Sequence, residues 1–312
     1  MAEVLIMGEM LVEIMRPTEG IPLDKEGHFR GPFPSGAPAI FIDTVAKLGH
    51  SAAIIGGVGK DDFGKCLIDR LKKDGVDCTY VIESDKNSTG VAFVTYFADG
   101  SRKFIFHMGN TPAVEPKAPD LSAMDDLKYF HVMGCSILSN IDFAREILKT
   151  MEAAQKMGAK ISFDPNIRKE LIKDNSVLEI INKILLNTNV FLPGVEELLM
   201  LSDETTIEKA VEKCFGNPAL EILALKKGSK GCKVYTRESI TEMGVYPVNP
   251  IDPTGAGDSF DGAFIAGLCE GKEIADVVKM ASAAGALNTA AFGPMEGDIT
   301  PATIKKMIEN NS

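Results

Sequence analysis

The chain lacks several features that mark metal-binding, secreted and membrane proteins. None of its six cysteines lies in a Cys-x-x-Cys pair, and its four histidines do not cluster at ligand spacing. We therefore expect reduced, mostly buried thiols and no structural zinc site. No apolar run approaches the roughly 18 to 20 residues of a membrane span, and residues 1–7 lack the basic start of a signal peptide. These absences predict a cytoplasmic protein without a membrane partner.

Positive charge is also scarce. The chain has 33 lysines and arginines against 44 aspartates and glutamates, a formal net charge of −11. Because binding to nucleic acid needs a basic face for the phosphates, we expect no nucleic-acid partner. An anionic small substrate is still compatible with this charge. The 312 residues contain no internal repeat and no low-complexity linker, so we predict a single domain over residues 1–312.

Short apolar strands alternate with helices along most of the chain. The first strand is expected at residues 4–7, and a helix at 40–48 and a strand from residue 53 follow it. Later strands, with helices between them, are expected at 129–133, 160–168 and 222–225. This alternation predicts an α/β fold in which helices cover both faces of a mostly parallel sheet. In such a sheet, ligands bind at the carboxyl ends of the strands.

Two segments depart from this alternation. Residues 79–108 are typical of consecutive strands with an Asp99-Gly100 hairpin turn, and residues 10–34 contain an apolar strand followed by an irregular stretch. We predict that the two segments form a small separate β-sheet, a lid that excludes water from reacting phosphates. Glu13 interrupts the apolar strand of the first segment. Its side chain lies either on a solvated face or in a polar cleft, and the sequence leaves both open.

Residues 249–268 carry the densest group of conformationally special residues. Two prolines keep the backbone extended, Thr254 is expected to cap the helix that follows, and Gly255 and Gly257 bracket the helix start. The unpaired N–H groups at such a start lie at the positive end of the helix dipole and can bind an anion. Asp258 lies in the first turn, where a carboxylate is stabilised. We therefore interpret the stretch as an anion site beside an acid rather than as an ordinary core helix.

Polar side chains follow two of the predicted strands. Asp164, Asn166 and Arg168 come after one strand, and the planar guanidinium of Arg168 suits a carboxylate or phosphate. Glu196 and Glu197 come after another and could support magnesium directly or through water. A capping or surface role is open for each of these residues.

Two glycine-rich turns suggest phosphate or nucleotide contacts to different degrees. The turn at 226–231 follows a strand and could form one edge of a nucleotide site. The stretch Gly59–Cys66 almost fits the phosphate-loop pattern, but Cys66 stands where that pattern needs a hydroxyl for magnesium. We therefore do not interpret the second stretch as a phosphate loop.

The stretch Asp252–Phe264 closely resembles the C-terminal signature of the ribokinase-like sugar kinases, also called the phosphofructokinase B family. Five further motifs occur in the family's order, namely Gly8-Glu9, Gly36–Ala39, Gly57–Gly64, Phe163–Arg168 and Lys227–Cys232. The resemblance therefore extends over essentially the whole chain. It implies a three-layer α/β/α fold with a small β lid, ATP as the phosphoryl donor and magnesium.

The resemblance also implies roles for individual residues. Asp258 would be the catalytic base for a sugar hydroxyl, and Gly255, Ala256 and Gly257 would form the anion hole. Contacts to the sugar are implied for Glu13, Gly36, Ala37, Arg168 and Asp258. Contacts to the nucleotide are implied for Lys226, Gly228, Gly231, Gly255, Gly257 and Asn288, with Asn288 near the adenine. Glu197 would support magnesium, and Asp252 would lie at a site for a monovalent cation such as K⁺.

Three departures from the family pattern concern the substrate. Ile40 stands where many members have Asn, and Glu13 where many have Asp. Gly194 replaces the Asn of an Asn-x-x-Glu motif that keeps Glu197. The pocket is therefore expected to be less polar near Ile40. Residues 35–43 resemble a subgroup of tagatose or fructose kinases.

These residues lead to one principal hypothesis and two alternatives. We expect an ATP-dependent kinase that phosphorylates the primary hydroxyl of a ketohexose, with tagatose or fructose as first candidates. A 2-keto-3-deoxygluconate kinase, in which Arg168 grips the sugar acid, is the alternative within the class. A sugar- or nucleotide-sensing module that has lost catalysis is the alternative from another class. We also expect a homodimer through the lid strands, because a small sheet must cover its exposed faces.

Overall fold

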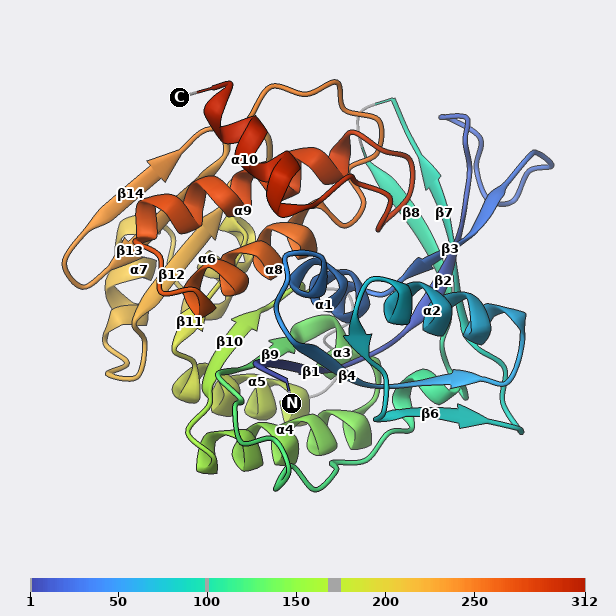
Figure 1. Ribbon diagram of the computed structural model, residues 1–312, viewed down its shortest axis with the longest axis horizontal. Coiled ribbons are helices and arrows are strands. Elements are labelled where there is room, and N and C mark those ends of the chain that lie inside the picture. Colours follow the sequence, from blue (N-terminus) through green and yellow to red (C-terminus); the bar gives the residue numbers. More distant parts are fainter. Residues whose placement is uncertain (1, 99–100, 168–174, 312) are drawn as a thin grey trace.

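The computed structural model describes residues 2–98, 101–167 and 175–311, which form two β-sheets flanked by helices (Figure 1). The larger sheet has ten strands in the order β14-β13-β12-β11-β10-β9-β1-β4-β5, with β6 paired to β4. These strands are β1 (Val4–Met7), β4 (Ala52–Gly59), β5 (Val76–Asp77), β6 (Val81–Ser84), β9 (Tyr129–Met133), β10 (Lys160–Asp164), β11 (Val190–Phe191), β12 (Ile222–Lys226), β13 (Cys232–Thr236) and β14 (Ile240–Met243). Among the described strands, only the pairs β12–β13 and β13–β14 of this sheet are antiparallel. The predicted α/β fold with a mostly parallel sheet is confirmed.

Helices cover both faces of the larger sheet, and each face has its own hydrophobic core (Figure 1). One side carries α1 (Ala37–Lys47), α2 (Asp62–Lys73), α8 (Ala256–Cys269), α9 (Ile274–Thr289) and α10 (Pro301–Glu309). The other carries α3 (Gly134–Ser139), α4 (Ile141–Lys156), α5 (Asn175–Asn187), α6 (Val195–Ser202) and α7 (Ile207–Phe215). The alternation of side chains along β1 serves both cores, because Val4 and Ile6 pack into the first and Leu5 and Met7 into the second.

A second sheet of four strands stands beside the larger one, in the order β3-β2-β7-β8 (Figure 1). It consists of β2 (Leu11–Met15), β3 (Arg30–Ser35), β7 (Gly90–Tyr96) and β8 (Arg102–His107). Its strands come from the two segments from which the sequence predicted a small separate sheet. Glu13 on β2 is only 6% exposed, so its side chain lies in the interior and not on a solvated face.

The start of the second segment was assigned to the wrong sheet. The sequence predicted a strand of the small sheet at residues 79–82, but β6 pairs in parallel with the second half of β4. The reason is the unequal length of neighbouring strands: β4 has eight residues, and β5 pairs only with Ala52 and Ala53. β6 therefore satisfies the backbone groups of β4 that β5 leaves unpaired.

The cysteines are less buried than the sequence predicted. All six cysteines are free thiols, but only Cys232 is fully buried and the other five are partly exposed. The described residues include no group of three or more His, Cys, Asp or Glu side chains arranged to hold a metal ion. Within the described ranges, no helix combines the length and the apolar character needed to cross a membrane.

Candidate active site

The site is built around the N-terminus of α8. Gly255 is the N-cap residue and has a φ of 79°, in the left-handed region that favours glycine. A Cβ atom on Gly255 would lie 2.5 Å from the carbonyl oxygen of Pro294, so the neighbouring loop leaves no room for a side chain. Gly257, in the first turn, is exposed. The N–H of Ala256 donates a 3.3 Å hydrogen bond to Pro253 O. The helix start at the glycine cap is therefore accessible to an anion chiefly at Gly257.

The predicted capping role of Thr254 is wrong. No side chain caps α8. The Thr254 hydroxyl instead lies 3.1 Å from the Tyr96 hydroxyl and accepts a hydrogen bond of 3.1 Å from Arg102 Nη1. Tyr96 and Arg102 belong to β7 and β8, so Thr254 connects the small sheet to the helix start.

Asp258 lies in the first turn of α8, partly exposed in the site. Desolvation and the nearby Asp164 carboxylate raise the pKa of Asp258 to about 7, against the opposing effects of Lys226 and Arg102. Asn166 Nδ2 lies 3.5 Å from Asp258 Oδ1 and donates to it. A carboxyl that titrates near neutral pH is suited to accept a proton from a hydroxyl.

Beneath Asp258, a buried ion triad joins three elements. Lys226 Nζ, at the end of β12, lies 2.9 Å from an Asp164 oxygen and 2.7 Å from an Asp261 oxygen. Asp261 is one turn after Asp258 on α8. The carboxyls of Asp164 and Asp261 are almost completely buried. The two carboxylates raise the pKa of Lys226, and Lys226 lowers the pKa of Asp164. Burial holds the pKa of Asp261 well above its usual range. Lys226 Nζ is also 4.0 Å from where a Cβ on Gly257 would stand, so its charge lies under the anion hole.

The end of β10 leads into a tight turn next to Asp258. Asp164 Oδ1 accepts a 3.1 Å hydrogen bond from the backbone N–H of Asn166, whose φ is 38°. This turn aims the Asn166 amide at Asp258. Arg168, the predicted ligand of the sugar or its acid group, lies outside the described residues.

Glu197 is held by the backbone. Its Oε1 accepts a 2.8 Å hydrogen bond from Ile167 N, and its Oε2 accepts one of 2.7 Å from Gly194 N. Burial and the Asp164 carboxylate raise the pKa of Glu197. Gly194, which stands where the family motif has Asn, still donates its backbone N–H to Glu197. Each carboxylate oxygen retains a lone pair for a water or a cation.

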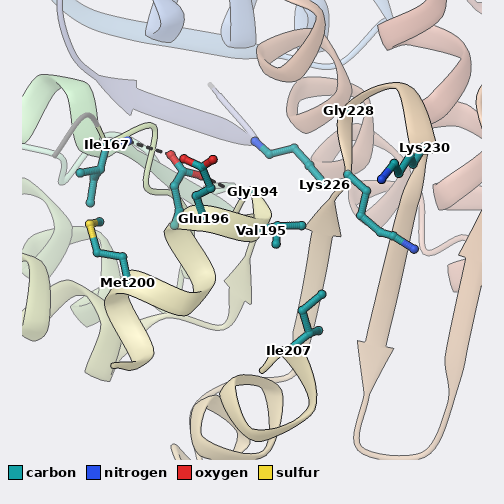
Figure 2. Close-up of a pocket in the computed structure, with 11 residues that line it drawn as sticks. Ile167, Gly194, Val195, Glu196, Met200, Ile207, Lys226, Gly228 and Lys230 are labelled. Carbon is teal, nitrogen blue, oxygen red and sulfur yellow. Dashed lines mark hydrogen bonds between the residues drawn. The ribbon is translucent and has the colours of Figure 1, made fainter. Parts of the chain in front are cut away.

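A cavity of about 830 Å³ opens beside this group, between α6 and the end of β12 (Figure 2). Lys226 and Gly228, both predicted nucleotide contacts, line it together with Glu197 and Met200. Gly231 does not belong to the lining. It has a φ of 84°, and a Cβ there would lie 2.0 Å from Met243 O, so glycine is needed for the turn into β13.

Asn288 has a different environment from the one the resemblance implied. Its side chain is fully buried in α9, and its Nδ2 donates a 2.7 Å hydrogen bond to Thr254 O. Asn288 thus supports the backbone that leads into the anion hole.

Asp252 is a buried junction just before the anion hole. Its Oδ1 accepts hydrogen bonds from the Tyr96 hydroxyl at 3.0 Å and from Thr254 N at 2.9 Å, and its Oδ2 accepts one from Gly293 N at 3.0 Å. The carboxylate therefore joins the small sheet, the start of α8 and the loop after α9. These contacts fix the backbone around the predicted monovalent-cation site.

The predicted sugar side lies where β2 and β3 meet α1. Glu13 Oε1 accepts a 2.7 Å hydrogen bond from the Ser35 hydroxyl. Gly36 is the N-cap of α1 with a φ of 102°, and Ala37 is the first helical residue. A Cβ on Gly36 would lie 2.6 Å from Glu9 O, so the backbone passes closely there. Ile40, one turn into α1, has Cγ2 at 3.2 Å from the Cβ position of Gly255, which places this side against the anion hole.

Comparison with known proteins assigns the family. A model of the pfkB family of carbohydrate kinases matches residues 1–301. The chain belongs to this family. Fructokinase-1 of Zea mays is 30% identical over 323 residues, which cover 98% of this chain and 97% of that protein. The resemblance read from the sequence is confirmed, and the protein is a sugar kinase.

Solved structures of similar proteins agree with the fold. A complex of an E. coli protein assigned as ribokinase II with ATP and Mg²⁺ has a TM-score of 0.91 and 37% identity, and the match covers 99% of this chain and all of that one. A double mutant of fructokinase from Vibrio cholerae O395, bound to fructose, ADP and a potassium ion, has a TM-score of 0.83 and 25% identity, with 99% and 98% covered. The ribokinase-like fold is therefore confirmed.

Two residues of this kinase site were missed in the sequence. Tyr96 and Arg102 lie in the small sheet, 158 and 152 positions from Thr254, and meet it only through the fold. A signal was present for Arg102, because an arginine directly after the hairpin turn of a predicted lid is placed to approach a phosphate. Tyr96 had no such signal, because an aromatic residue in a strand is ordinary.

Proposed function

We propose that this kinase transfers the γ-phosphate of ATP to the primary hydroxyl of a ketohexose, with fructose and tagatose as the first candidates. The observation that carries the proposal is the position of Asp258 in the first turn of α8, next to the Gly255 cap. Phosphoryl transfer needs in-line positioning and stabilisation of charge more than covalent chemistry. The similarity to fructokinases supports a ketohexose as the acceptor.

In this proposal each residue of the site acts on charge or position. Asp258 accepts the proton of the attacking hydroxyl, and Asn166 orients the Asp258 carboxyl. The N–H groups of Gly255, Ala256 and Gly257 stabilise the charge on the transferring phosphate. Glu13, Gly36 and Ala37 contact the sugar, and Arg168 would contact the sugar or its phosphate.

We place the nucleotide in the cavity beside β12, against Lys226 and Gly228. Asn288 supports the phosphate end of the site through Thr254 and not by touching the adenine, and Gly231 shapes the turn. The E. coli relative solved with ATP and Mg²⁺ supports ATP as the nucleotide.

The carboxylates of the cavity are compatible with magnesium. Mg²⁺ is usually held by one or two carboxylates, waters and substrate phosphates, and Glu197 has lone pairs available beyond its two backbone hydrogen bonds. When bound, the metal would neutralise charge on the phosphates. Asp252 is our candidate for the acidic group near a monovalent cation. A fructokinase relative solved with a potassium ion supports the presence of such a cation.

The experiment that tests the proposed function is ADP release with ATP over a panel of ketohexoses, aldoses, sugar acids and nucleosides. We expect turnover above the rate without sugar for fructose, tagatose or both. Turnover only with 2-keto-3-deoxygluconate would replace the substrate assignment by the sugar-acid alternative. Binding of sugar without ADP formation would support the sensing module instead.

Arg102 is expected to contribute to the transfer. Its guanidinium donates to Thr254 beside the anion hole, and its charge lowers the pKa of Asp258. Arg102→Ala should reduce kcat by roughly tenfold to a hundredfold, the scale of a lost charge-stabilising donor. The matched control is Lys103→Ala, which removes the next exposed cation of the same strand and should leave kcat near that of the wild type. Equal kcat in both variants would contradict a role for Arg102.

The lid strands are our proposed dimer contact. Phe29, Ile105 and Phe106, on or beside the small sheet, are 39%, 42% and 46% exposed. Because Ile105 and Phe106 are consecutive on β8, apolar area is exposed on both faces of this sheet. We expect a dimer by light scattering at assay concentration, and Phe106→Lys should convert it to a monomer. A monomeric wild type would remove the proposal.

A further inference from the structure

We propose that a charged clamp formed by Asp43, Lys47, Arg70, Asp74 and Glu296 positions the anion hole from outside the active site. The clamp joins α1 and α2 to the loop that follows α9. None of its five side chains belongs to the catalytic or binding residues named above. The inference rests on the proposed function for its kinetic consequence, but its structural part can be tested separately.

Two cationic side chains of the clamp converge on one backbone carbonyl. Lys47 Nζ donates a 2.9 Å hydrogen bond to Met295 O, and Arg70 Nη2 donates to the same oxygen. Met295 itself is 2% exposed. A carbonyl that accepts from two charged donors is held more strongly than one with a single neutral donor.

Acidic side chains on both helices hold these two cations, and burial raises the pKa of one of them, Asp43, to about 7. Asp43 lies 2.8 Å from Lys47 Nζ and Asp74 lies 2.6 Å from Arg70 Nε, each pair spaced four residues apart on its helix. Asp74 also reaches Lys47 at 3.8 Å, and Arg70 Nη1 binds Glu296 at 2.8 Å. The side chains of all but Glu296 are between 1% and 17% exposed, so solvent screens these pairs less than ordinary surface pairs.

The clamped loop contacts the anion hole at two points. Gly293 N donates to Asp252 Oδ2 at 3.0 Å, and Asp252 in turn accepts from Thr254 N. Pro294 O lies 2.5 Å from the position of a Cβ on Gly255, which is direct backbone packing. Because Met295 follows Pro294 in the chain, movement of the Met295 carbonyl would shift both contacts. The clamp therefore holds the segment against which residues 252–255 are positioned.

The test compares Arg70→Gln with Lys65→Met on the same helix. Lys65→Met removes an exposed ion pair with Asp69 that has no contact with the loop. In Arg70→Gln we expect a loss in kcat of about tenfold or more with a sugar KM within about twofold, because small displacements of a reacting group cost rate more than binding. Arg70→Lys, which keeps one cationic donor, should recover part of kcat. Lys65→Met should match the wild type.

Hydrogen exchange of the peptide covering residues 250–258 gives a readout that does not depend on turnover. We expect faster exchange at these amides in Arg70→Gln than in Lys65→Met, with unchanged exchange in β9 and β10. If Arg70→Gln does not fold, Glu296→Gln is the second variant. It removes the ion pair that joins Arg70 to the loop after α9. If the variant that folds has the kcat and the exchange rates of the wild type, the inference is wrong. This outcome would leave the proposed function intact. If no sugar is turned over, the exchange comparison alone decides the inference.

Discussion

Asp258→Asn is expected to lower kcat by about a hundredfold or more, because it removes the group that accepts the proton of the attacking hydroxyl. The substitution keeps the size of the side chain and the first turn of α8, so nucleotide binding should change little. ADP release at saturating ATP and sugar gives kcat, and titration calorimetry with a non-hydrolysable ATP analogue gives the nucleotide affinity. Near-normal turnover in this variant would refute the role of Asp258 as the base.

The same variant should be more stable than the wild type at alkaline pH. The folded-state pKa of Asp258 is raised to about 7, whereas an unfolded aspartate titrates near 3.9. As the pH rises between these values, the unfolded chain loses its proton first, so the wild-type carboxyl increasingly destabilises the fold. Because the site is partly open to solvent, we expect Asp258→Asn to gain on the order of 2 kcal/mol at pH 8. Near pH 4 the gain should vanish, and denaturant titrations at the two pH values measure it.

Lys226→Met is expected to cause the largest loss of stability. It leaves the buried carboxyls of Asp164 and Asp261 without their shared cation, and breaking a buried pair in this way costs roughly 3–5 kcal/mol. Urea unfolding at pH 8 measures the loss. The adjacent Lys227→Met provides the control, because it removes only the pair with the exposed Glu242 and should cost no more than about 1 kcal/mol.

The pH dependence distinguishes this explanation from simple loss of packing. Without Lys226, the folded-state pKa of Asp164 should rise above that of an unfolded aspartate, and the already raised pKa of Asp261 should rise further. Each carboxyl then destabilises the fold as the pH rises from its unfolded to its folded pKa. The deficit of Lys226→Met relative to the wild type should therefore be smaller at pH 5 than at pH 8. A deficit that does not change with pH would indicate that the methylene chain, not the charge, matters.

The parts of the site that local sequence determines were predicted well. The start of α8 follows from glycines and prolines within a few residues, and the alternation of strands and helices predicts the mostly parallel sheet. Where two local solutions compete, the prediction was less reliable. Threonine is a residue type that often caps helices. The Thr254 hydroxyl instead forms hydrogen bonds with Tyr96 and Arg102, and Gly255 is the N-cap residue.

Features that depend on distant segments could not be predicted in the same way. The pairing of β6 with β4 depends on how short β5 is, which no pattern within residues 79–82 reveals. The triad of Lys226, Asp164 and Asp261 requires the ends of β10 and β12 to meet the N-terminal half of α8. In the sequence, each residue is only a polar group near a strand end or in a helix. The fold shows that both carboxyls pair with the same lysine.

The most direct test of the central claim is the identity of the product formed from ATP and fructose or tagatose. Proton-coupled ³¹P NMR of the reaction should show one new phosphomonoester that couples to the two protons of a primary carbon, formed in equal amount with ADP. ADP accompanied only by inorganic phosphate, or a phosphate on a secondary carbon, would contradict the proposal that Asp258 and the anion hole direct transfer to a primary hydroxyl.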